Sequence, residues 1–154
     1  MWGACKQSQM PLRDEVLFLL LLDTGMRIGE ACTLTLDHIK LDERVIVIGT
    51  EGKDRRERLV PIGEQQKRDG GRTVRALRAY LDRRPLSARG GNRLFLGRDG
   101  FPLESAGGSD VIARLGKVAG VADVHPHRLR HTLTTFYLAT SWDCDESSAT
   151  PVAP

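Results

Sequence analysis

The feature that most restricts the fold of this chain is an uninterrupted apolar run at Val16–Leu22, preceded by the segment Pro11-Leu12-Arg13-Asp14-Glu15. A proline in the first turn and acidic residues near the positive end of the helix dipole favour a helix that begins there. A helix that is apolar on nearly all sides has to be covered by other elements, so we expect it at the centre of the core. The run has seven residues, whereas a membrane span needs about 20, and a membrane span is therefore excluded.

The segment Asp23-Thr24-Gly25 is predicted to close this helix, because Gly25 suits the left-handed position that follows a helix end. A second short helix is expected from Ile28 through Leu34. Met26 and Arg27 would then lie at a junction between two helices.

Two strands are predicted next. Residues 44–48 are rich in β-branched side chains, and residues 57–62 alternate polar and apolar residues. The connection between them is polar and contains glycine, which predicts a β-hairpin with Lys53 at its tip.

Further helices are expected over residues 74–84, from near Ser109 to Val118, and over 127–138, with Gly107-Gly108 taken as an interruption before the second of these. The fold class is thus mainly α with a small antiparallel β-hairpin or sheet, an α+β arrangement. Residues 1–140 are predicted to form a single domain. Residues 141–154 are small and polar with two prolines and are expected to form an irregular or frayed tail.

Composition alone does not separate DNA binding from a solvated surface. The formal net charge is only +3, although the arginines occur in clusters, and such clusters are most often solvated helix faces. The three cysteines follow no close spacing, which favours reduced thiols. The first ten residues do not have the pattern of a secretion signal, so we expect a cytoplasmic protein.

Arg27 and Glu30 form the first motif with chemical potential, within Thr24-Gly25-Met26-Arg27-Ile28-Gly29-Glu30. Three residues apart at the start of a helix, the two side chains can share a face, and the carboxylate can hold the guanidinium in a fixed orientation. An ordinary salt bridge at a helix end is the alternative interpretation. Lys53 by itself is typical of a solubilising charge.

The second motif is His125-Pro126-His127-Arg128-Leu129-Arg130-His131. Pro126 favours an extended conformation at the residue before it, so a helix should start near His127 and place His127, Arg130 and His131 on neighbouring turns of one face. No nearby carboxylate completes a metal-binding set, and no metal site and no cofactor are predicted.

Together, TGMRIGEACTLTLDHI, the hairpin lysine, NRLFLGRDGFPLE and HPHRLRHT resemble the catalytic domain of the tyrosine recombinase (phage integrase) family. The resemblance runs from about Leu12 to Leu138. It implies that Arg27 and Arg130 grip the scissile phosphate of DNA and that Glu30 supports Arg27. This is chemically reasonable, because planar guanidiniums with paired donors stabilise the charge that gathers on a phosphate under attack.

The resemblance also implies that Lys53 protonates the leaving 5′ oxygen, that His127 assists proton transfer, and that His131 has a supporting role. Further contacts to DNA are expected from three arginines beside these motifs, Arg55, Arg56 and Arg128. The expected partner is double-stranded DNA, together with other recombinase subunits as a possible second partner.

The family's nucleophile, a tyrosine on a helix beyond the His-x-x-Arg-His helix and after a Gly-His segment, is not identified in this sequence. Tyr80 falls in the central helix, and Tyr137 follows Arg130 by about 10 Å along one helix, where the family counterpart packs inward. About ten residues precede the first expected helix, where the family has a DNA-clamping domain. The chain is accordingly expected to be truncated at both ends and inactive alone.

The leading hypothesis is a DNA-binding domain of a site-specific recombinase or integrase, concerned with DNA recombination and integration, that holds a scissile phosphate without supplying the nucleophile. The alternative is a non-catalytic interaction module that docks on intact recombinase subunits. The remaining alternative, a helical domain with merely solvated arginines, would require separate motifs to occur in the family's order by chance.

Overall fold

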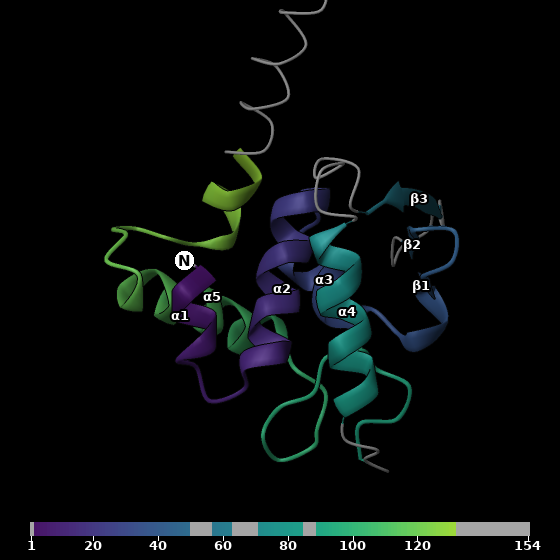
Figure 1. Ribbon diagram of the computed structural model, residues 1–154, viewed down its shortest axis with the longest axis horizontal. Coiled ribbons are helices and arrows are strands. Elements are labelled where there is room, and N and C mark those ends of the chain that lie inside the picture. The colour runs from purple at the N-terminus through teal and green to yellow at the C-terminus, as the bar shows by residue number, and fades with distance from the viewer. Residues whose placement is uncertain (1, 50–56, 63–70, 85–88, 132–154) are drawn as a thin grey trace, which may run out of the picture.

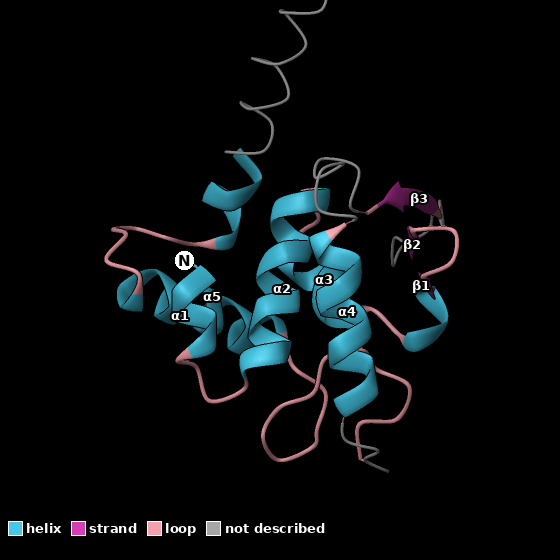
Figure 2. Cartoon of the chain, in the orientation of Figure 1, coloured by secondary structure: helices cyan, strands magenta, loops and turns pink. Residues whose placement is uncertain are grey.

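A computed structural model describes residues 2–49, 57–62, 71–84 and 89–131 of the 154-residue chain. Helices predominate in it, and the strands form one small sheet at the edge of the molecule (Figure 2). In chain order the elements are α1 (Trp2–Lys6), α2 (Pro11–Thr24), α3 (Ile28–Thr33), the 3-10 helix η1 (Leu36–His38), β1 (Ile39–Lys40), β2 (Val45–Ile48), β3 (Arg58–Pro61), α4 (Arg72–Arg83) and α5 (Ser105–Val118). Residues 126–131 are also helical.

Helix α2 is the central element, as its apolar run predicts. It packs against α1 and α5 on one side and against α3 and α4 on the other (Figure 1). Residues 16–21 are all buried. Gly25 ends the helix in the left-handed conformation (φ 60°), and its N–H donates to the Leu21 carbonyl at 3.1 Å. The predicted cap is confirmed.

The sheet has three antiparallel strands in the order β1-β2-β3. Val45 pairs with Pro61 and Ile48 with Arg58, so the predicted hairpin is confirmed by the described parts of its two strands. Ile46 and Ile48 face the core and are fully buried. The two-residue strand β1 was not predicted, because a segment this short carries no recognisable alternation.

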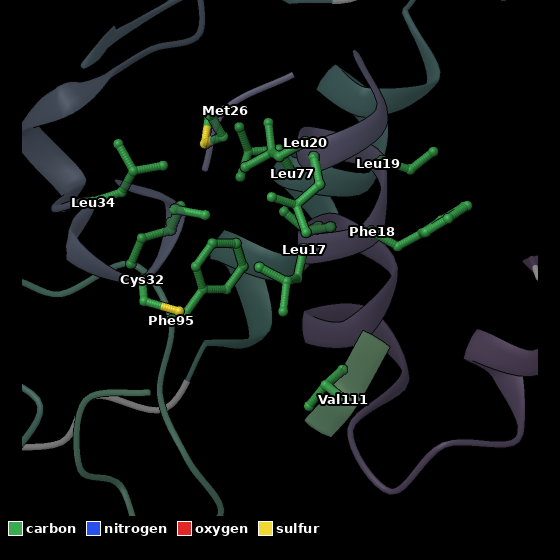
Figure 3. Packing of buried hydrophobic residues seen from close by; sticks show 14 of the residues in the cluster. Leu17, Phe18, Leu19, Leu20, Met26, Cys32, Leu34, Leu77, Phe95 and Val111 are labelled. Atoms are coloured by element: carbon green, nitrogen blue, oxygen red, sulfur yellow. The ribbon is translucent and has the colours of Figure 1, made fainter. Parts of the chain in front are cut away.

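Backbone hydrogen bonds join residues 34–36, which directly follow α3, to residues 92–94. The Leu94 N–H donates to the Leu34 carbonyl at 2.8 Å, and the Leu36 N–H donates to the Asn92 carbonyl at 2.9 Å. Phe95, which follows, is fully buried and lies between Leu17 and Cys32 (Figure 3). The segment that carries Phe95 therefore completes the core around α2 and α3.

Helix α5 begins at Ser105, four residues before the predicted start near Ser109, and the expected interruption at Gly107-Gly108 is wrong. The reason is packing between helices. A Cβ atom at Gly108 would lie 2.9 Å from Cys32 Sγ and 2.9 Å from Ile28 Cδ1 of α3. Glycine lowers helix propensity, but here it allows two helices to approach closely.

Two further expectations change at the ends of the chain. Helix α1 occupies Trp2–Lys6 and packs against α2 and α5, so the first helix begins before the predicted position. The last helix starts at Pro126, one residue early, and is described only to His131. Residues 132–138 of that helix, the domain boundary at 140 and the tail 141–154 lie outside the described residues.

Among the described residues, no helix combines the length and the apolar character that a membrane crossing requires. The same part of the chain contains no group of three or more His, Cys, Asp or Glu side chains arranged to hold a metal ion.

Candidate functional site

A cavity of about 560 Å³ opens where four separated parts of the chain meet. The turn between α2 and α3 and the first turns of α3 supply one wall. The end of β2, the start of α5 and the helix of residues 126–131 supply the others. The described residues that line the cavity are Met26, Arg27, Ile28, Gly29, Glu30, Thr33, Gly49, Ser105, Pro126, His127 and Arg130. We refer to this cavity as the arginine pocket.

Arg27 reaches the pocket because its neighbours fix the turn before α3. Met26 is buried in the core, and its N–H donates to Thr24 Oγ1 at 3.3 Å. Arg27 itself has an extended backbone (φ −74°, ψ 151°), and 65% of its side chain is exposed. A buried anchor is thus followed directly by a solvent-facing guanidinium.

Glu30 lies one turn into α3 and is only 12% exposed. Its Oε2 accepts the backbone N–H of Arg27 at 2.6 Å, which is favourable for a carboxylate at a helix N-terminus. Its Oε1 lies 3.7 Å from Arg27 Nη1, so the ion pair expected from the three-residue spacing is present. Oε2 also accepts a hydrogen bond from Arg58 Nη2 of β3 at 2.9 Å.

His127 and Arg130 come from the helix of residues 126–131. Leu129 is buried in the core and holds this helix against the rest of the domain. The spacing of three residues then places both side chains in the arginine pocket, with His127 exposed and Arg130 half-buried. The pocket therefore brings the pair Arg27 and Glu30 together with the pair His127 and Arg130. The two pairs are separated by at least 97 positions in the sequence.

Two other predicted residues of this segment lie elsewhere. His131 is exposed and is not among the described residues that line the pocket. Arg128 is exposed, forms an ion pair with Asp123 at 3.3 Å, and donates to the carbonyl oxygen of Ala122. These contacts hold the turn before the helix, and a role for Arg128 in DNA binding stays a prediction.

Lys53, Arg55 and Arg56 lie outside the described residues, and their predicted roles stay predictions. Gly49, the last described residue before that segment, lines the pocket at the end of β2. Thr33, Ser105 and the Arg58 contact to Glu30 were missed by sequence reasoning. Ser105 was missed because α5 begins earlier than predicted. The Arg58 contact was missed because the alternating pattern of a strand does not indicate a partner 28 positions away.

Tyr80 is part of the core. Its side chain is 2% exposed, its hydroxyl donates to the Leu94 carbonyl at 3.0 Å, and its ring stacks on Phe95 with centroids 6.0 Å apart. Burial raises the pKa of the Tyr80 hydroxyl above its ordinary value. Tyr80 is not among the described residues of the pocket, and Tyr137 lies outside the described residues.

Comparisons with known proteins identify the family of this chain. Residues 1–147 match the phage integrase family. A tyrosine recombinase XerC of Corynebacterium glutamicum is 35% identical over 127 residues, which cover 82% of this chain and 38% of that protein. A tyrosine recombinase XerC of a Mycobacterium species is 34% identical over 140 residues, with 88% and 44% covered. The chain thus spans less than half the length of these relatives.

Solved structures show the same fold. The crystal structure of XerA recombinase superposes with a TM-score of 0.75 and 28% identity, over 90% of this chain and 46% of that chain. The XerH site-specific recombinase bound to difH substrate, in a pre-cleavage complex, gives a TM-score of 0.71 at 23% identity, with 92% and 41% covered. The mainly helical architecture with a small antiparallel sheet is that of a tyrosine recombinase catalytic domain. The chain belongs to the phage integrase family, the family of tyrosine recombinases.

Proposed function

We propose that this chain is a DNA-binding domain of a site-specific recombinase and that the arginine pocket holds one phosphate of the DNA backbone. The observation that carries the proposal is the presence of two guanidiniums, Arg27 and Arg130, in one cavity together with His127. A guanidinium offers paired donors that match phosphate oxygens, and it stays charged at all relevant pH values. Two of them suit a phosphate that gains negative charge during strand transfer.

The proposal assigns the proton transfers to neighbouring groups. His127 lines the same cavity as both arginines and is exposed, so it can reach an oxygen of a bound phosphate. Lys53 follows Gly49, a residue of the pocket, by four positions in the sequence. Its proposed role as the acid for the leaving 5′ oxygen rests on the family resemblance and on this proximity along the chain.

We further propose that neither Tyr80 nor Tyr137 acts as the nucleophile. The Tyr80 hydroxyl is buried and donates to a backbone carbonyl of the core. Tyr137 follows Arg130 by seven residues, about two helical turns, where we expect it to pack inward. The chain should then bind DNA without becoming covalently attached to it.

The similar proteins support a DNA partner. The XerH structures contain difH substrate, and Tn1549 transposon integrase has been solved in complex with circular intermediate DNA. Relatives with 34–35% identity are tyrosine recombinases. Docking on intact recombinase subunits stays a second prediction, which co-purification with a full-length relative would test.

Binding of a short fluorescein-labelled duplex, followed by fluorescence anisotropy, tests the pocket. Arg27→Ala and Arg130→Ala are each expected to weaken binding about tenfold, and each should lower the slope of log affinity against log salt by about 1. Arg78→Ala is the matched control, because Arg78 is 60% exposed on α4 and pairs only loosely with Asp42 at 3.9 Å. Pocket variants that bind like the Arg78 variant would contradict the proposal.

A nicked duplex that traps covalent intermediates tests the nucleophile. Incubation with the wild-type chain, followed by denaturing electrophoresis, is expected to give no shifted protein band. A covalent adduct that peptide mapping assigns to Tyr137 or Tyr80 would overturn this part of the proposal while leaving phosphate binding intact.

A further inference from the structure

We propose that Arg58 of β3 is a positioning residue of the arginine pocket, acting on Arg27 through the carboxylate of Glu30. The inference rests on the proposed function and deepens it, because it says how the orientation of one phosphate-binding guanidinium is maintained. It concerns a residue that the sequence motifs do not include and that is not among the described residues lining the pocket.

The geometry places three donors around one carboxylate. Glu30 Oε2 accepts the Arg27 backbone N–H at 2.6 Å and the Arg58 Nη2 at 2.9 Å. The other oxygen, Oε1, lies 3.7 Å from Arg27 Nη1. Arg58 therefore binds Oε2, the oxygen that also accepts the Arg27 backbone N–H. The Arg27 guanidinium is left with the longer contact of 3.7 Å to Oε1.

This division of the carboxylate matters for a ligand. A carboxylate normally attracts arginine through two parallel hydrogen bonds, which would use two of the guanidinium donors. Because Arg58 holds Oε2, Glu30 is restrained from closing on Arg27 with both oxygens. The Arg27 guanidinium, 65% exposed, then keeps donors for a phosphate in the pocket while still being oriented by Oε1.

The contact also joins two separate parts of the fold. Arg58 is the first residue of β3, 28 positions after Glu30, and it follows Lys53 by five positions. Its side chain is 44% exposed, whereas Glu30 is 12% exposed. A half-exposed ion pair of this kind adds little to stability, so its main effect is to fix the position of β3 relative to the start of α3 and the orientation of Glu30.

A double-mutant cycle in DNA binding tests the inference, with the anisotropy assay and duplex described above. Arg58→Gln is expected to weaken binding about fivefold in the wild-type background and to have no further effect in the Arg27→Ala background. Arg58→Lys keeps a cation that can reach Glu30 and should restore most of the affinity. Arg78→Gln controls for the loss of one positive charge, and thermal unfolding of every variant should remain close to that of the wild type.

The outcomes separate the inference from the proposed function. Equal losses from Arg58→Gln in both backgrounds would show that Arg58 contacts DNA directly, and the inference would be overturned. The absence of any loss in the wild-type background would overturn it as well. If Arg58→Gln fails to fold, Arg58→Met, which also removes the donor to Glu30, decides by the same comparison of the two backgrounds. Normal binding by Arg27→Ala would instead remove the proposed function itself.

Discussion

The interior around α2 and the arginine pocket both contain arginine, but they use it in opposite ways. In the interior, Arg13 is 5% exposed, donates to Asp14 Oδ1 at 2.7 Å, and donates to the Leu96 carbonyl at 3.0 Å. Arg84 is 8% exposed and donates to the carbonyl oxygens of Leu94 and Gly91, each at 3.2 Å. In the pocket, Arg27 is 65% exposed and faces a cavity.

The hydrogen-bond partners of each side chain separate a structural arginine from one that can bind a ligand. The donors of Arg13 and Arg84 are used by carbonyl oxygens of residues 91–96, so these side chains help to hold that segment in the core. The donors of Arg27 are turned toward solvent, with Glu30 as an orienting group. Four measurements test the stability and the accessibility of these two regions.

The largest effect is expected for Arg13→Ala. It should lower the free energy of unfolding by about 3–5 kcal/mol, because Asp14, which is 0% exposed, loses its 2.6 Å ion pair and keeps only the Arg114 guanidinium at 4.0 Å. Urea denaturation followed by circular dichroism measures the change. The paired replacement Arg13→Met with Asp14→Leu removes both charges and should recover much of the loss. If Arg13→Ala alone had nearly wild-type stability, Arg13 would not be needed to stabilise the fold.

A smaller effect concerns the thiols of Cys5 and Cys32, whose pKa burial raises to about 11 from the ordinary value of 9.0. The folded state holds these protons more tightly than the unfolded state. Their contribution to stability is therefore fully present below pH 9 and is lost as the pH rises toward 11. Urea denaturation between these pH values should give midpoints that fall with rising pH.

Thiol labelling tests whether the core is closed to the pocket. Cys32 is buried, whereas its neighbour Thr33 lines the pocket. In a Cys144→Ser background, a disulfide reagent at neutral pH should react slowly with the native protein and rapidly after unfolding in urea. Fast labelling of Cys32 in the native protein would mean that the interior is open to the pocket.

The smallest effect on stability is expected for Arg27→Ala, within about 0.5 kcal/mol in urea denaturation. The Arg27 backbone N–H still donates to Glu30 in this variant, so the start of α3 keeps its cap. If Arg27→Ala lost as much stability as Arg13→Ala, Arg27 would be a structural arginine like Arg13, and the two regions would not differ in this respect.

Local sequence signals predicted a large part of this molecule. The apolar run of α2, the cap at Gly25, the pairing of Arg27 with Glu30 and the shared face of His127 and Arg130 each depend on residues a few positions apart. Such features follow from helix periodicity and capping chemistry.

The parts that sequence reasoning missed depend on contacts between distant segments. Glycine at 108 reads as a helix breaker until Cys32 and Ile28 are known to lie against it. The bond from Arg58 to Glu30 crosses from a strand to a helix, and no periodicity along the chain indicates it. The roles of Lys53, Arg55 and Arg56 stay predictions from the family resemblance.

The burial of α2 beneath Phe95 has a consequence for the synthesis of the chain. Leu20 leaves the ribosome 75 residues before Phe95, which corresponds to roughly 4–15 s of translation. During this interval the most hydrophobic helix has no access to the aromatic ring that will cover it. Until that ring emerges, the apolar face of α2 that it covers has to remain exposed or be covered by other groups.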